Sequence, residues 1–151
     1  MAEHEYTAAI NWSGTTRGGY RSFSRTHTAS LAGASDLTMS ADAAFRGDAD
    51  LTNPEQLLVV AASSCQMLSF LASAARAGVD VVGYEDLARG RMPLRDGQMS
   101  ITDIELRPVI QVRGADGDAV EDLVHVAHER CYIANSLRSE VRVIPKIVIF
   151  G

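Results

Sequence analysis

Short alternating patterns near the N-terminus predict β-strands. Residues 6–12 alternate between apolar and polar side chains, as expected for a strand with one face against an apolar surface. A turn rich in glycine and threonine follows, and residues 20–31, rich in aromatic residues, threonine and serine, could return as the second strand of a meander. Residues 42–50 are polar and predict a loop that contains Phe45 and Arg46. The first third of the chain therefore indicates a small sheet.

The clearest helix begins near residue 53. Thr52 and Glu55 have the spacing of a capping box, in which each side chain accepts a hydrogen bond from the other residue's backbone. Alternatively, Asn53 caps the helix and Pro54 takes its first position, where a missing N–H does no harm. Gly78 predicts the end of the helix. Apolar residues recur at steps of three or four, at Leu57, Ala61, Cys65, Leu68, Ala72 and Ala75.

This helix is apolar on nearly all sides, which is typical of a central, buried helix. Its length approaches that of a membrane span, but it carries several serines and a glutamine, and no basic cluster marks a flank. We therefore expect a core helix and no membrane association. So much apolar surface is difficult to bury in one small domain, so we expect a second subunit to help cover it, as in a homodimer.

The middle of the chain predicts a return to sheet. Residues 79–84 turn into a strand, and residues 84–92 and 100–113 would pair as a hairpin across the dipeptide Asp96-Gly97, which is typical of hairpin turns. Apolar residues keep one face of the returning strand, at Ile104, Leu106, Ile110 and Val112.

The last part of the chain predicts a shorter helix and a final strand. Asp118 can cap the helix, whose apolar stripe runs on to Cys131. Residues 140–150 would form the strand, with Pro145 at an edge or a bulge because proline lacks the N–H of a central strand. The stripe of the helix consists of Val120, Val124 and Ala127.

The order of these elements predicts the fold class. Strands and helices are segregated along the chain, which indicates an α+β fold with antiparallel sheets around a long central apolar helix and a second, shorter helix. The chain has 151 residues, the size of one domain, so we expect a single domain over residues 1–151.

Composition narrows the functions that are possible. Hydrophobic residues make up 46% and charged residues 22%, which excludes a disordered chain. A net charge of −5 and only 6% aromatic residues argue against nucleic acid or an anionic membrane as partner. Residues 1–5 are acidic and lack the apolar run of a signal peptide, so we expect a cytoplasmic protein whose two cysteines stay reduced.

The two cysteines are candidates for thiol chemistry. The simplest interpretation makes Cys65 and Cys131 inert buried thiols, because free cysteine is common in cores. Two cysteines on two predicted helices also favour a redox pair, although spacing alone does not show contact. A reactive thiol must become a thiolate, and burial opposes this unless a cation lies close. Arginine stays charged and offers several donors, and the candidates, each also a possible surface residue, are Arg17, Arg21, Arg25 and Arg46.

Glu55 and two histidines allow more than one interpretation. Glu55 has a structural role if it closes the capping box, and it could also hold an active-site arginine. The series His125, His128 and Cys131 suggests zinc, but a residue six positions along a helix points away from the first, so we expect no metal site. No phosphate-binding loop, nucleophile elbow or zinc-protease motif occurs, and no cofactor is expected.

Two segments place the cysteines in a recognisable context. Residues 52–58 read TNPEQLL and residues 61–65 read AASSC, and the second cysteine lies in AHERC, residues 127–131, before IANS. Together they resemble the OsmC/Ohr family of hydroperoxide-reducing proteins, with its N-P-E-x-L…A-x-x-A/S-C signature and a second cysteine some 60 residues downstream. The order of predicted elements fits the resemblance along essentially the whole chain.

The resemblance implies a fold and an activity. It implies an intertwined homodimer with the two long helices packed centrally, and thiol-dependent peroxidase chemistry at the dimer interface. Cys65 would be the peroxidatic cysteine and Cys131 the resolving one, with a disulfide between them that an external dithiol reduces. Glu55 would hold the active-site arginine. The apolar surroundings favour organic hydroperoxides over hydrogen peroxide, and neither a metal nor an organic cofactor is required.

The resemblance leaves the arginine and the pocket open. Arg46 in FRGD, residues 45–48, is the preferred match, Arg17 matches a branch with the arginine in the N-terminal hairpin, and Arg25 is a further candidate. The candidate substrate pocket comprises Phe45, Gln66 and Met67.

Two departures from the family pattern lie against the sulfurs. Gln66 follows Cys65 where one subgroup usually has histidine, and Tyr132 follows Cys131 where the best-known branches have proline. They bear on substrate preference and catalytic efficiency. The alternative to a peroxidase is a non-catalytic protein of the same fold that binds a small apolar ligand or senses oxidants.

Overall fold

The computed structural model describes residues 2–151 and divides into two compact units. The N-terminal unit reaches to Leu57, and the C-terminal unit comprises Leu58–Gly151. Helix α1 (Pro54–Arg76) begins in the first unit and lies mostly in the second. A single domain over residues 1–151 stays a prediction.

The N-terminal unit is built on a three-stranded antiparallel meander, as the sequence predicts. It consists of β1 (Ala8–Asn11), β2 (His27–Leu31) and β3 (Leu37–Met39), hydrogen-bonded in that order. The second strand is shorter than the predicted 20–31, because the Arg25 guanidinium donates to the carbonyl oxygens of Tyr20 and Phe23 and holds that segment in a loop. The polar stretch 42–50 contains a 3₁₀ turn, η1 (Ala43–Phe45), capped by Asp42.

Helix α1 begins where the sequence predicts, but with a different cap. Pro54 is its first residue, and the side chain of Asn53 accepts from the backbone N–H of Gln56 at 2.8 Å while the Gln56 side chain accepts from that of Asn53 at 3.0 Å. The alternative with Asn53 and Pro54 is therefore confirmed, and the capping box of Thr52 with Glu55 is wrong. The helix ends at Arg76, two residues before Gly78, whose φ of 72° turns the chain away.

The buried face of α1 differs from the predicted stripe. Steps of four bury Ala62, Gln66, Phe70 and Ala74, whereas Leu68 remains 60% exposed. The stripe through Cys65 is wrong because the helix is apolar on several sides, so apolar spacing alone does not select a face. Among the described residues, α1 alone is long and apolar enough to cross a membrane, a test that core helices of soluble proteins also pass.

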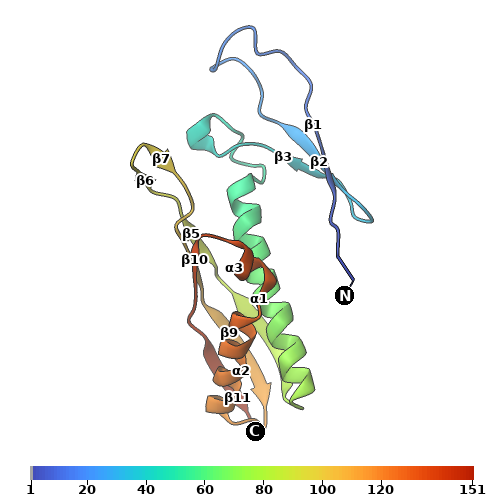
Figure 1. Cartoon of the computed structure of the whole chain (residues 1–151), viewed down its shortest axis with the longest axis vertical. Coiled ribbons are helices and arrows are strands. Elements are labelled where there is room, and N and C mark those ends of the chain that lie inside the picture. Colours follow the sequence, from blue (N-terminus) through green and yellow to red (C-terminus); the bar gives the residue numbers. More distant parts are fainter. Residues whose placement is uncertain (1) are drawn as a thin grey trace. The chain divides into compact units, whose positions relative to one another are not determined.

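Three sheets form the frame of the C-terminal unit (Figure 1). The strands are β4 (Asp80–Asp86), β5 (Arg89–Arg91), β6 (Leu94–Arg95), β7 (Gln98–Met99), β8 (Asp103–Leu106), β9 (Pro108–Arg113), β10 (Glu140–Val143) and β11 (Lys146–Phe150). Two sheets have the orders β11-β9-β4 and β10-β8-β5, and β6 and β7 pair around the turn at Asp96-Gly97. The predicted hairpin is confirmed, because β4 and β5 pair antiparallel with β9 and β8.

The last strand corrects the expectation of purely antiparallel sheets. Residues 140–150 split at Ile144-Pro145 into β10 and β11, which pair parallel with β8 and β9. The helical crossover after β9 returns the chain in the same direction, which makes the added strands parallel. Both lie at sheet edges, as the position of Pro145 predicts.

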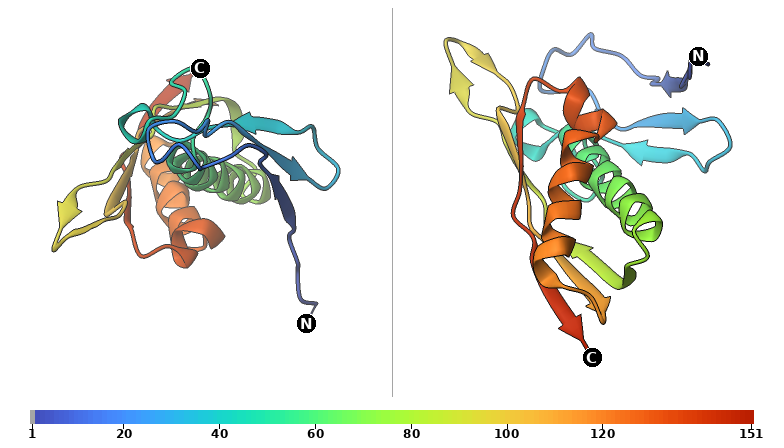
Figure 2. Two further views of the ribbon diagram at one scale, coloured as in Figure 1. Left: turned by 90° about the horizontal axis from the view of Figure 1, so that it is seen from above. Right: turned by 60° about the horizontal axis from the view of Figure 1, so that its bottom comes forward.

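The second helix carries the predicted stripe but has other ends. Helix α2 (Gly117–Glu129) is capped by Asp116, not by Asp118, because the Asp116 side chain accepts from the backbone N–H of Asp118. It stops at Glu129, so Cys131 lies in the turn before α3 (Tyr132–Ser136) and not on the helix. Helix α2 (orange) lies beside α1 (green) in Figure 2. The main core consists of Phe70, Ala74, Ile110, Val112, Val120, Val124 and Ala127.

Candidate functional site

Cys65 lies in the middle of α1 and is half-buried, with a free thiol. Its helix neighbours hold α1 against the rest of the unit. Ser63 donates to a carboxylate oxygen of Asp86 at 2.5 Å, and Ser69 donates to the carbonyl oxygen of Ala127 at 3.1 Å. The position of this sulfur is thus fixed by contacts on both sides of it along the helix.

Cys131 is buried, with 1% of its surface exposed, and its thiol is also free. It caps the start of α3, where its carbonyl oxygen accepts from the backbone N–H of Asn135 at 3.0 Å. Its own N–H donates to the carbonyl oxygen of His128 at 3.2 Å. The turn between α2 and α3 therefore holds both backbone groups of this residue.

The structure brings the two cysteine side chains together, although 66 positions separate them. The Cys65 side chain lies close enough to the Cys131 thiol to change its pKa. Burial raises the pKa of the Cys131 thiol, the backbone of Ala134 lowers it by hydrogen bonding, and the Cys65 side chain raises it further. These causes make the Cys131 thiol harder to deprotonate than an ordinary cysteine thiol.

A cavity of about 440 Å³ is lined by residues of α1 that neighbour Cys65 in the sequence, although neither cysteine lines it. Ser64 and Met67, on either side of Cys65 in the sequence, both line it, so Met67 lies where a substrate pocket is predicted. Asp86 is the one charged residue in its wall, and its two oxygens accept from Ser63 and from the backbone N–H of Arg107. The remaining lining residues are mostly apolar and comprise Val59, Val60, Ser63, Tyr84, Leu87 and Ala88.

Gln66 lies elsewhere than a pocket wall. Its side chain is fully buried, its amide nitrogen donates to the carbonyl oxygen of Val124 at 3.2 Å, and its amide oxygen has no hydrogen-bond partner. The residue joins α1 to α2, and its place in a substrate pocket stays a prediction. Tyr132, the other departure from the family pattern, is 82% exposed.

The N-terminal unit holds a second cavity, of about 280 Å³, and three predicted residues share it. Arg25, Phe45 and Glu55 all line its wall. The guanidinium carbon of Arg25 lies 3.7 Å from the centre of the Phe23 ring, and its nitrogens donate to two backbone carbonyls, so the group is held in place. One carboxylate oxygen of Glu55 is buried without a hydrogen-bond partner.

The other candidate arginines have fewer contacts. Arg46 is exposed and ends η1 with a φ of 66°, and Arg17 is exposed in the loop after β1. Arg21 is exposed as well. Within the N-terminal unit, Arg25 is therefore the arginine that shares a cavity with Glu55.

The histidines near Cys131 do not gather into a metal site. His125 is exposed, with its ring 3.7 Å from a carboxylate oxygen of Glu121. In the part of the chain that the structure describes, no three His, Cys, Asp or Glu side chains lie together as metal ligands would.

Tyr84 lines the cavity next to Asp86 but is not among the site residues predicted from the sequence. Its hydroxyl is buried without a hydrogen-bond partner, and its ring lies 6.0 Å from that of Phe70. Burial, the charge of Asp86 and that of Cys131 raise the pKa of Tyr84, in that order of importance. A signal was available, because Tyr84 and Asp86 are two residues apart on one strand and so share a face.

Comparison with known proteins decides the family. Residues 47–146 match the model of a family described as OsmC-like protein, and this match covers about two thirds of the chain. The chain belongs to the OsmC-like family. The resemblance drawn from the two cysteine segments is thereby confirmed.

Two further similarities cover most of the chain. An OsmC-like protein of unknown function from Vibrio cholerae O1 biovar eltor str. N16961 is 32% identical, with a TM-score of 0.85 over 97% of this chain and 100% of that one. The uncharacterised protein YmaD of Bacillus subtilis (strain 168) is 25% identical over 137 residues, which are 90% of this chain and 83% of YmaD.

A third OsmC-like relative carries a functional name. It is an organic hydroperoxide resistance protein, OsmC, from Legionella pneumophila, 17% identical, with a TM-score of 0.69 over 97% of this chain and 98% of that one. At this identity the likeness shows the fold alone. The predicted α+β class with two main helices is confirmed by these structures and by the elements described above.

Proposed function

We propose that this protein is a thiol-dependent peroxidase that reduces organic hydroperoxides and, more weakly, hydrogen peroxide. The observation that carries the proposal is that the side chains of Cys65 and Cys131, far apart in the sequence, lie close together, one half-buried and one buried. Family membership supports it, because the family includes proteins named for organic hydroperoxide resistance.

The proposed reaction has three steps. The Cys65 thiolate attacks one peroxide oxygen, the O–O bond breaks, and the alkoxide leaves and takes a proton to become an alcohol, while Cys65 becomes a sulfenic acid. The Cys131 sulfur then attacks the Cys65 sulfur, the S–O bond breaks, and the oxygen leaves as water. An external dithiol reduces the disulfide by thiol–disulfide exchange and is itself oxidised.

The cavity lined by Ser64 and Met67 supports a preference for organic hydroperoxides. Its wall is mostly apolar, and its one carboxylate, Asp86, is already occupied by two donors. An alkyl group gains free energy when it leaves water for such a wall, at about 25 cal/mol per Å² of buried apolar surface. Hydrogen peroxide has no alkyl group and gains nothing from it.

A guanidinium beside the thiolate would stabilise the charge that develops on the leaving oxygen. We propose Arg25, in place of the Arg46 that the resemblance favours, as the arginine that Glu55 holds. Arg25 lines a cavity together with Glu55, whose buried carboxylate oxygen lacks a donor, whereas Arg46 is exposed. Arg25→Lys should then slow the reaction with peroxide more than Arg46→Lys does, and the reverse order would return the role to Arg46.

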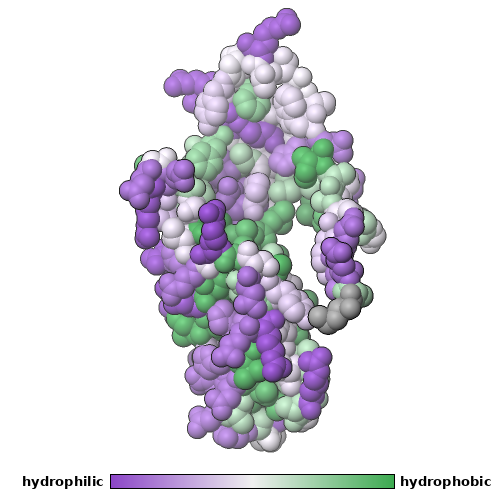
Figure 3. Space-filling model, in the orientation of Figure 1, coloured by the Kyte–Doolittle hydropathy of each residue, from purple (hydrophilic) through white to green (hydrophobic). Residues whose placement is uncertain are grey.

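We further propose that the active form is a cytoplasmic homodimer. On α1, Val60 is 59% exposed and Leu68 is 60% exposed, which is unusual for large apolar residues on a long helix. Hydrophobic side chains also reach the surface on the face drawn in Figure 3. A second copy of the chain would cover such residues, and sedimentation of the purified protein tests this directly.

Turnover with the two single serine variants tests the peroxidase. With cumene hydroperoxide and no added thiol, Cys131→Ser should consume one equivalent per subunit and retain Cys65 as a sulfenic acid. With excess dithiothreitol, the wild type should consume many equivalents and Cys65→Ser none. Mass spectrometry of the wild type after one equivalent of peroxide should show a Cys65–Cys131 disulfide. A wild type that itself stops after one equivalent would be an oxidant sensor, and full activity in Cys65→Ser would exclude the mechanism.

A further inference from the structure

Two hydrogen bonds join α1 to α2 next to the cysteines. The Gln66 amide nitrogen donates to the Val124 carbonyl oxygen at 3.2 Å, and the Ser69 hydroxyl donates to the Ala127 carbonyl oxygen at 3.1 Å. Both acceptors are backbone groups of α2, so the bonds constrain the helix itself and not a mobile side chain.

These bonds lie close to both sulfurs along the chain. Gln66 directly follows Cys65, and Ser69 comes one helical turn after it. On the other helix, Ala127 lies four residues before Cys131. The contact between the helices is thus made by the immediate neighbours of Cys65 and by the last turns before Cys131.

The turn that carries Cys131 moves with α2. The backbone N–H of Cys131 donates to the His128 carbonyl oxygen, and the side chain of Asn135 donates to the Glu129 carbonyl oxygen at 3.1 Å. Because α3 is tied back to the end of α2 in this way, the placement of α2 on α1 determines how near the Cys131 sulfur lies to Cys65.

Packing alone does not explain Gln66. The other buried residues on this face of α1 are Ala62, Phe70 and Ala74, all apolar, and the Gln66 amide oxygen has no hydrogen-bond partner. A buried polar atom without a partner opposes folding, and an apolar side chain of similar size would avoid that loss. The amide therefore serves something other than stability at this position.

We propose that Gln66 and Ser69 are positioning residues that set the approach of Cys131 to Cys65. Disulfides form only within a narrow range of Cα separations, about 4.4–6.8 Å, so a small displacement of α2 changes the probability that the sulfurs meet. The inference deepens the proposed peroxidase function, in which the Cys131 thiol attacks the Cys65 sulfenic acid and releases water. It also applies to any oxidant that links the two sulfurs.

The thiol–disulfide equilibrium with glutathione tests the inference without peroxide. Oxidised glutathione takes two electrons from the cysteine pair, so the ratio of disulfide to dithiol at a known glutathione ratio reports the effective concentration of one thiol at the other. Ser69→Ala and Gln66→Met should each lower this effective concentration about three- to tenfold, as expected for the loss of one hydrogen bond.

Matched controls separate positioning from general destabilisation. Ser73 is a partly buried serine of the same helix whose hydroxyl donates within α1, to the Ser69 carbonyl oxygen, so Ser73→Ala should leave the equilibrium unchanged. Ser69→Thr retains a hydroxyl and should restore it. Wild-type values in Ser69→Ala and Gln66→Met, or an equal fall in Ser73→Ala, would overturn the proposal. Should Gln66→Met not fold by circular dichroism, Ser69→Ala decides alone.

A single-turnover experiment with cumene hydroperoxide separates this inference from the proposed function. In Ser69→Ala, disulfide formation should slow while the initial oxidation of Cys65 proceeds, so a sulfenic acid trapped by a 1,3-dione probe should accumulate. A disulfide rate equal to that of the wild type would count against positioning. If peroxide oxidises no form of the protein, the peroxidase proposal fails, and the glutathione result still stands.

Discussion

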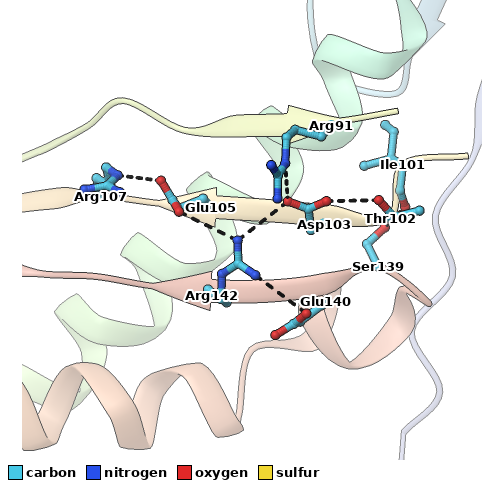
Figure 4. A network of polar contacts seen from close by, with 9 residues as sticks. All are labelled: Arg91, Ile101, Thr102, Asp103, Glu105, Arg107, Ser139, Glu140 and Arg142. Carbon is cyan, nitrogen blue, oxygen red and sulfur yellow. Dashed lines mark hydrogen bonds and ion pairs between the residues drawn. The ribbon is translucent and has the colours of Figure 1, made fainter. Parts of the chain in front are cut away.

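Two polar clusters of the C-terminal unit are organised in opposite ways. The side chains of Cys131 and Gln66 are buried and uncharged, and the Gln66 amide and the Cys131 backbone N–H each donate one hydrogen bond to a backbone carbonyl. On the β10-β8-β5 sheet, a network of charged side chains lies at the surface (Figure 4). Its members are Arg91, Asp103, Glu105, Arg107, Glu140 and Arg142.

The two clusters differ in whether other contacts remain when one contact is lost. In the network Asp103 and Glu105 each have two cationic neighbours: Asp103 lies 2.7 Å from Arg91 and 3.6 Å from Arg142, and Glu105 pairs with Arg107 and Arg142. Water and salt screen such pairs, so the loss of one leaves others in place. Near the cysteines each of these buried donors has a single partner. Loss of that partner leaves the group buried and unpaired, which costs free energy. Disturbance at the cysteines should therefore have larger effects.

The largest effect on stability is expected at the apolar support of the cysteine site. Phe70 is fully buried in the main core, one to two turns after Cys65, with its ring 6.0 Å from that of Tyr84. Phe70→Ala removes a large side chain and leaves a cavity, which should lower the free energy of unfolding by about 3–5 kcal/mol. Urea denaturation measures this. A loss below about 1 kcal/mol would show that α1 does not depend on this packing.

The next largest effect is the pH dependence of disulfide formation. Burial, the first cause of the raised Cys131 pKa, persists after Cys65 is oxidised, so the resolving thiol stays protonated at neutral pH. A raised pKa means that the thiolate appears only as the pH rises above the range of an ordinary thiol. The single-turnover rate should therefore increase about tenfold per pH unit between pH 6 and 8. A flat profile would contradict a buried, protonated nucleophile.

Asp86 is intermediate between the two clusters, because its carboxylate is partly buried and accepts two specific hydrogen bonds. It accepts from the Ser63 hydroxyl at 2.5 Å and from the backbone N–H of Arg107 at 2.7 Å, which ties α1 to the β-structure. Hydrogen bonds to charged groups contribute about 1.5–3 kcal/mol, so Asp86→Ala should lower the free energy of unfolding by about that amount. Ser63→Ala is the matched control, because it removes one of the two bonds and should cost less.

The sequence predicted the elements of this fold better than their contacts. The meander, the hairpin at Asp96-Gly97 and the stripe of α2 follow local rules of alternation, turn chemistry and helical period. The cap at Asn53 was one of two alternatives that local spacing allowed. The direction of β10 and β11 was not available, because it depends on a crossover and not on the pattern within either strand.

The candidate site could be predicted only in part, for a related reason. Family resemblance singled out the two cysteines, and their contact required coordinates. A helix that is apolar on several sides does not reveal which face is buried, so the hydrogen bond from Gln66 to α2 could not be predicted from the sequence. The resemblance prefers Arg46 to Arg25, and only the cavity that Arg25 shares with Glu55 favours Arg25.

The smallest effect is expected in the ion-pair network, where pH and salt sharpen the comparison with the cysteines. The hydrogen bond from Arg91 is the main cause that lowers the pKa of Asp103, and that from Arg107 does the same for Glu105. A carboxyl whose pKa is lower in the folded state than in the unfolded state stabilises the fold when the pH is above its unfolded-state pKa. This stabilisation is lost as the pH falls through its folded-state pKa. Asp103→Asn should therefore reduce stability slightly at neutral pH and not at acidic pH. Because the pairs are exposed, about 1 M salt should remove the difference between the variant and the wild type in urea denaturation. A large loss that persists at high salt would mean that this surface is organised like the cysteine site, by bonds that water does not replace.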